Sequence, residues 1–211
     1  MTPIPDQHPL KQLFGRLTER NFSEALGWPN FEVTDYVANL LLEFIHTDQL
    51  TRIKNHEGEP VETVVELLYE TESHSQHSSV EKECDVHRHI GDLTLFLAGV
   101  FPEYCSRIKC SGLIHHKDFL VDYVKAGKRS YGIVASHQDP QAKNPPSLFQ
   151  TLSTNFELCV AGLGFVRLDL DRFQDSPSHQ ANTILYHKEC EGFVDRSFSS
   201  NLHQRSRKTT N

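Results

Sequence analysis

Long apolar runs, regularly spaced cysteines and alternating strand patterns are all missing from this chain of 211 residues. No segment approaches the roughly 18 uninterrupted apolar residues of a membrane-spanning helix, so we expect no membrane span. Runs of alternating β-branched residues are nearly absent, which disfavours β-strands. These absences leave an all-α chain as the expected fold class.

The five cysteines lack the spacing of a cross-linked or metal-binding protein: they are Cys84, Cys105, Cys110, Cys159 and Cys190. An odd number without regular spacing is typical of free thiols in a reducing compartment. Cys105 and Cys110 are too far apart for a CxxC motif, and no second pair completes a zinc site. We therefore predict neither a disulfide framework nor a zinc cluster.

The charge balance and the N-terminal residues exclude further classes of protein. The formal net charge is −7, whereas nucleic-acid-binding domains are usually basic, so a nucleic-acid partner is not expected. Residues 1–17 do not have a charged region followed by an apolar core, which disfavours a secretory signal. The expected location is the cytoplasm.

Apolar residues recur with the helical period in several segments. These segments cover residues 10–26, 35–53, 60–71, 80–101, 118–135 and 146–173. Thr34 or Asp35 would cap the second segment, and Pro60 would open the third. We predict an all-α fold, a single bundle of five or six helices over residues 10–175, with a flexible lead-in (1–9) and a flexible polar tail (176–211).

The run HRHIGDLTLFLAGVFPE at residues 87–103 places charged side chains inside a strongly apolar helix. An unpaired buried charge is very costly, so each of these side chains needs a partner. On a helical wheel His89 lies at the edge of the apolar face, and Asp92 and Glu103 lie just beyond it. They form a polar seam along a buried helix, and Arg129 or Glu157 is the expected answering residue.

Two interpretations of the seam stay open. His89 and Asp92 are three residues apart and can face one neighbour together, as a metal-binding or acid–base pair. Alternatively, they orient the helix by bonding to Lys128, Arg129 or Tyr131.

Glu157 is a second candidate, because it is the only charged residue between Asn155 and Arg167. A partly buried carboxylate there would have a raised pKa and could bind a metal or act as a base. It could equally pair with Arg129 or His89.

Two shorter motifs are weaker evidence for a functional site. Glu43 and His46 form one Glu-x-x-His motif, but di-iron bundles need two such motifs and two further glutamates. Residues 127–131, GKRSY, do not have the glycine spacing of a phosphate loop. Lys128 and Arg129 could still bind an anion.

The motif RHxGDxxLFxxGxFPE at residues 88–103 resembles that of an uncharacterised family of bacterial all-helical proteins. The stretches GKRSY from Gly127 and FELCVAGLGFVR from Phe156 resemble the same family. The likeness covers residues 33–172. It implies a soluble bacterial protein and supplies no reaction or substrate.

Three hypotheses for the function follow. The first is a non-enzymatic binding or interaction protein that meets a protein partner or a second copy of itself. Its candidate binding residues are His89, Asp92, Lys128, Arg129 and Tyr131. The second is a metal-dependent oxidoreductase or hydrolase, with Fe, Mn or Zn held by His89, Asp92, Glu103 and Glu157. The third is a small-molecule or anion sensor that uses Lys128 and Arg129.

Overall fold

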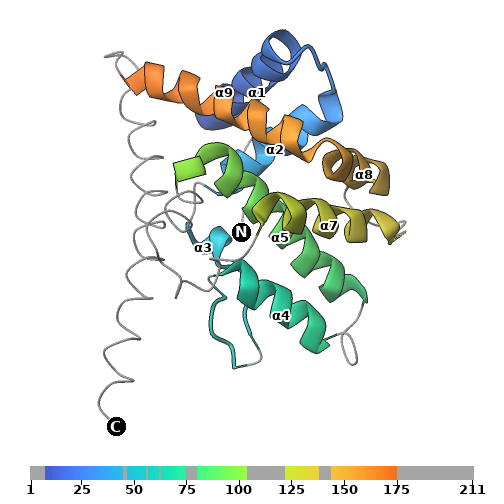
Figure 1. Cartoon of the computed structure of the whole chain (residues 1–211). Helices are drawn as coiled ribbons and strands as arrows, with labels where there is room; N and C mark the ends of the chain where they lie inside the picture. The colour runs from blue at the N-terminus through green and yellow to red at the C-terminus, as the bar shows by residue number, and fades with distance from the viewer. Residues whose placement is uncertain are drawn as a thin grey trace.

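The longest helix, α5 (Val80–Val100), runs through the middle of the molecule, and most of the other helices pack around it (Figure 1). The computed structural model describes residues 8–44, 47–55, 57–61, 63–74, 80–103, 122–137 and 144–174. The remaining elements are α1 (Pro9–Arg20), a π-helical turn η1 (Asn21–Ala25), α2 (Phe31–Glu43), α3 (Thr47–Leu50), α4 (Val64–His74), α7 (Tyr123–Ser136), α8 (Pro146–Thr154) and α9 (Phe156–Gln174).

The all-α class is confirmed, since the described residues contain no strand. The described residues contain seven helices of nine or more residues, one more than the six predicted segments, because the segment predicted as a single helix over 146–173 is two helices. Asn155 separates α8 from α9: its backbone leaves the helical region (φ −109°, ψ 29°). Its side-chain amide donates to the carbonyl of Thr151 at 3.0 Å, a local bond that competes with helix continuation.

Two helices, α2 and α4, begin at other residues than predicted, because side chains cap them there. The α2 helix begins at Phe31, because the Asn30 side chain accepts a hydrogen bond from the amide of Val33 at 3.1 Å. The predicted caps Thr34 and Asp35 therefore lie inside the helix. The α2 helix also ends at Glu43, so the segment predicted as one helix to residue 53 is divided, and the apolar period alone did not reveal this break.

The predicted turn at residues 55–60 is confirmed, although Pro60 does not open a helix. Gly58 has a φ of 82°, and an isolated β-bridge joins Lys54 to Pro60 across the turn. The Thr63 hydroxyl accepts from the amide of Glu66 at 3.3 Å, and α4 begins at Val64. Residues 1–7, 104–121, 138–143 and 175–211 lie outside the described residues, and with them most of the predicted lead-in, the whole predicted tail and three of the cysteines.

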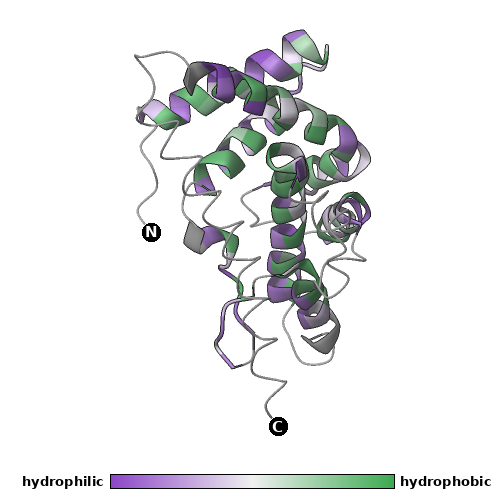
Figure 2. Ribbon diagram, turned by 60° about the vertical axis from the view of Figure 1, so that its left-hand side comes forward, coloured by the Kyte–Doolittle hydropathy of each residue, from purple (hydrophilic) through white to green (hydrophobic). Residues whose placement is uncertain are grey.

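The helices bury one continuous apolar core. The α7 helix lies alongside α5, α9 crosses α5, α4 packs on α5, and α1 packs on α2 (Figure 1). Along the helices, hydrophobic and hydrophilic residues alternate as expected for helices that bury one face (Figure 2). The largest fully buried side chains include Phe14, Phe22, Phe96, Tyr131 and Phe156. Among the described residues, no helix combines the length and apolarity needed to cross a membrane.

Glycines set how closely α9 approaches its neighbours. A Cβ added at Gly99 of α5 would lie 2.5 Å from the Cβ of Leu163 on α9. A Cβ added at Gly162 of α9 would lie 2.3 Å from the ring of Phe22. Both distances are shorter than real contacts allow. The helices can therefore approach this closely only because Gly99 and Gly162 have no side chain.

We expect Gly99→Ala to lower the free energy of unfolding by about 1–3 kcal/mol, because overpacking forces the two backbones apart. Gly15→Ala is the matched control, since a Cβ at Gly15 meets nothing within 4 Å. That control should stabilise α1 by about 0.5–1 kcal/mol. Urea unfolding of the three proteins measures both effects, and equal stability of Gly99→Ala and wild type would contradict the close crossing.

Candidate functional site

The carboxylate of Asp92 lies in the centre of the helix assembly and accepts hydrogen bonds from two tyrosines. The hydroxyl of Tyr36 on α2 donates to Oδ1 at 2.6 Å, and the hydroxyl of Tyr131 on α7 donates to the same oxygen at 2.8 Å. Asp92 is 7% exposed. One side chain of α5 thus ties together α2, which precedes it in the chain, and α7, which follows it.

The electrostatics of this cluster are set mainly by burial. Burial raises the pKa of Asp92, while the two tyrosine hydroxyls and the nearby guanidinium groups of Arg88 and Arg52 act in the opposite direction. Burial, together with the Asp92 carboxylate, raises the pKa values of Tyr36 and Tyr131 well above their usual value. Both hydroxyls therefore stay protonated as donors, and neither tyrosine is prepared to act as a base.

A small polar pocket opens beside Asp92 between α2, α5 and α8. Its volume is about 130 Å³, and its lining includes Glu43, Arg52, Arg88 and Asn144. Ligand pockets usually measure about 300–1,000 Å³, so this space suits a few water molecules or a very small ligand. Among the charged residues of this pocket, Arg88 pairs with Asp85 at 3.2 Å.

His89 lies on the same helix as Asp92 but has a different set of partners. The Nε group of Arg52, which can only donate, bonds to Nδ1 of His89 at 3.1 Å. The other ring nitrogen, Nε2, therefore carries the proton and donates to the carbonyl of Leu50 at 3.1 Å. Burial and the Arg52 charge lower the pKa of His89 to about 3. His89 is a neutral histidine whose two ring nitrogens hold the α3 region on α5.

Three of the other predicted site residues, Lys128, Glu157 and Glu103, are held in surface ion pairs. Lys128 donates to Glu157 at 2.8 Å, and Glu103 accepts from Arg167 at 2.6 Å. Arg129 is exposed. The predicted raised pKa of Glu157 is wrong: the carboxylate is exposed, and the hydrogen bond from Lys128 lowers its pKa. Arg129 is not its partner.

Asp92 and Tyr131 are brought together, as one of the two interpretations of the seam predicted. The four candidate metal ligands, by contrast, have four different sets of partners: two tyrosines for Asp92, Arg52 and Leu50 for His89, Arg167 for Glu103, and Lys128 for Glu157. Within the described parts of the chain, no group of three or more histidine, cysteine or acidic side chains could hold a metal ion. Of the Glu-x-x-His motif, Glu43 is exposed and His46 lies outside the described residues.

A second buried carboxylate, Asp169 on α9, was not predicted from the sequence. It accepts from Arg20 and, at 2.8 Å, from the side-chain amide of Asn21. Although burial acts to raise it, the pKa of Asp169 is lowered, because these hydrogen bonds outweigh the burial. Its place in the sequence, one residue before a core leucine, was the available signal; the partners, in α1 and η1, are too distant in sequence to be inferred.

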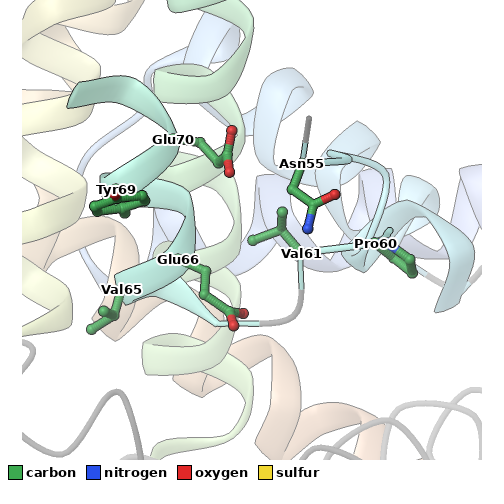
Figure 3. Close-up of a pocket in the computed structure, with 7 residues that line it drawn as sticks. All are labelled: Asn55, Pro60, Val61, Val65, Glu66, Tyr69 and Glu70. Carbon is green, nitrogen blue, oxygen red and sulfur yellow. The ribbon is translucent and has the colours of Figure 1, made fainter. Parts of the chain in front are cut away.

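The larger pocket lies between α4 and the 55–61 loop and has a volume of about 380 Å³, within the usual range for ligands (Figure 3). Its walls are mainly apolar, with Pro60, Val61 and Val65 among them. Figure 3 shows the Glu66 and Glu70 carboxylates on the side of α4 that faces the loop. The chemistry of this pocket suits a cationic group on an apolar chain better than an anion. From the sequence, this segment is predicted only as a helix with one apolar face.

The chain matches no protein-family model, no curated protein and no solved structure. The resemblance to a bacterial family therefore stays a prediction, and function has to be argued from the geometry of the chain itself.

We expect Tyr131→Phe to lower the free energy of unfolding by about 1–3 kcal/mol, the usual cost of removing a hydrogen-bond donor from a buried acceptor. The ring keeps its packing against Phe149 and Phe156, so the hydroxyl alone is tested. Tyr69→Phe is the control. Tyr69 is 68% exposed, so removal of its hydroxyl group should change the free energy of unfolding by less than about 0.5 kcal/mol. Equal effects in chemical denaturation would show that the bond to Asp92 adds nothing.

His89 should make the fold sensitive to acid. Its pKa falls from 6.5 in the unfolded chain to about 3 in the folded protein, so the folded state binds fewer protons between these values. The contribution of His89 to the free energy of unfolding is therefore fully present above pH 6.5. Below that pH it falls, by at most about 1.4 kcal/mol per pH unit.

Unfolding free energies measured at several pH values between 7 and about 4.5 test this dependence. His89→Gln should flatten the slope. Phe44→Leu, which changes a ring packed against His89, should lower stability at every pH and keep the slope. A wild-type slope in His89→Gln would show that another group is responsible.

Proposed function

We propose that the protein is a non-enzymatic helical interaction protein that binds a protein partner through the exposed face of α9. The observation that carries the proposal is a row of apolar side chains on that face. Ala161, Phe165 and Leu168 are all exposed, with Phe165 at 39% and Leu168 at 51%. Positions three and four apart lie above one another on a helix, so the three side chains form one patch.

The α9 outer face, defined as Glu157, Ala161, Phe165, Leu168 and Arg172, is opposite the side of α9 that enters the core. The buried hydrophobic residues of the same helix are Phe156, Cys159, Leu163, Val166 and Leu170. A helix with an apolar face on both sides is typical of one that packs on its own fold and also meets a second molecule.

The other exposed large hydrophobic residues do not gather in this way. Phe31, Tyr69 and Val80 lie at separate points on α2, α4 and α5. Single exposed hydrophobic residues are ordinary on protein surfaces and need no functional explanation. The contiguous patch on α9 is therefore the better basis for a binding surface.

The buried polar residues support the non-enzymatic part of the proposal. Asp92, Tyr36 and Tyr131 bond to one another, and both ring nitrogens of His89 bond within the fold. These bonds favour the packing interpretation of the polar seam over a His/carboxylate site. A cytoplasmic location in a bacterium is also part of the proposal. The location rests on the sequence patterns, and the bacterial origin rests on the resemblance to the bacterial family.

Site-specific photo-crosslinking in cells that make the protein tests this surface. A photoreactive amino acid at position 161 should form a covalent adduct with the partner, and mass spectrometry would identify that partner. The control places it at position 81, an exposed site at the start of α5. Absence of an adduct at position 161, or equal adducts at both positions, would refute the proposed surface.

A further inference from the structure

We propose that the partner is a second copy of this chain, and that the two α9 outer faces pack antiparallel about a two-fold axis. The inference rests on the proposed function, because it names the occupant of the same surface. It is carried by the charge pattern of the face: an acidic residue, Glu157, lies at one end, a basic residue, Arg172, lies at the other, and apolar residues lie between them.

The pattern is self-complementary about a point between Gly164 and Phe165. Glu157 and Arg172 are equally distant from that point along α9, and so are Ala161 and Leu168. A two-fold axis there places Glu157 opposite Arg172 of the second copy and the small Ala161 opposite the larger Leu168. In a two-fold dimer each contact occurs twice, so both ends of the helix pair gain an attraction.

The opposite orientation is disfavoured by the same charges. A parallel pair would bring Glu157 next to Glu157 and Arg172 next to Arg172, and like charges in contact repel. The helix dipoles add to this preference, since antiparallel helices place opposite partial charges side by side. Charge thus selects the direction, while the apolar residues supply most of the attraction.

Both end residues are accessible for a second contact. The Glu157 side chain is 58% exposed beside Lys128, and the Arg172 side chain is 78% exposed beside Asp169. A carboxylate can accept several hydrogen bonds, and a guanidinium has five N–H donors. The bonds within one chain therefore leave capacity for the pairs between copies.

The size of the face predicts a reversible dimer. From Glu157 to Arg172 the helix extends about 22 Å, and one helix pair of this length buries well under the roughly 1,200 Å² of a stable complex. The dimer should therefore form and dissociate readily, with a dissociation constant in about the micromolar range or weaker.

Sedimentation analysis of the full chain, up to about 500 μM because the interface is small, tests the proposal. We expect a monomer–dimer equilibrium for the wild type. Glu157→Arg and Arg172→Glu should each weaken it about tenfold, since two attractions become repulsions. An equimolar mixture of the two variants should recover the dimer, because opposite charges again meet at both ends.

Two matched variants check for unspecific effects. Leu168→Glu should abolish the dimer, whereas Val80→Glu, a similar change at a residue that is 59% exposed on α5, should leave it intact. Circular dichroism would verify that every variant folds. A wild type that stays monomeric, or variants that do not recover in the mixture, would overturn the dimer. A monomeric wild type together with an adduct at position 161 with a different protein would overturn the dimer and leave the proposed function standing.

Discussion

The carboxylate of Asp92, shared by two tyrosine hydroxyls, is the interaction on which the helix arrangement depends. Tyr36 and Tyr131 are 56 and 39 residues away in the sequence, yet both donate to the same oxygen. A buried carboxylate without donors would destabilise the fold strongly. Both donors are in place only when α2 and α7 have the right rotation and depth against α5. Burial thus makes one polar contact specify the positions of three helices.

The long apolar helices were predictable because their evidence is local. The predicted helix over residues 80–101 agrees with α5, which ends one residue earlier at Val100, and its apolar residues recur with the helical period. The breaks were harder to predict. The apolar period continues across Asn155 and across residues 44–46, and only the backbone and side-chain hydrogen bonds show that the helix ends there. Periodicity reports which residues face the core, and it does not report where the backbone turns.

The site was predictable in part for the same reason. Charges within the apolar run of α5 indicated buried polar contacts, and Tyr131 was among the predicted partners of Asp92. Tyr36, Arg52 and Asp169 were missed, since their roles depend on which helices meet in space. Glu157 was misjudged because its apolar neighbours on α9 form an exposed face. An apolar surface and an apolar core look alike in a sequence.

The bond between Arg20 and Asp169 joins residues separated by 149 positions, the start and the end of the described helices. At the usual ribosomal rates of about 5–20 residues per second, α9 emerges roughly 7–30 s after α1. Until then Phe22 has no Gly162 to pack against, and the part of α1 and η1 that α9 covers stays open, although α1 can already pack on α2. During synthesis the N-terminal helices therefore keep an apolar surface exposed on the side that α9 later covers.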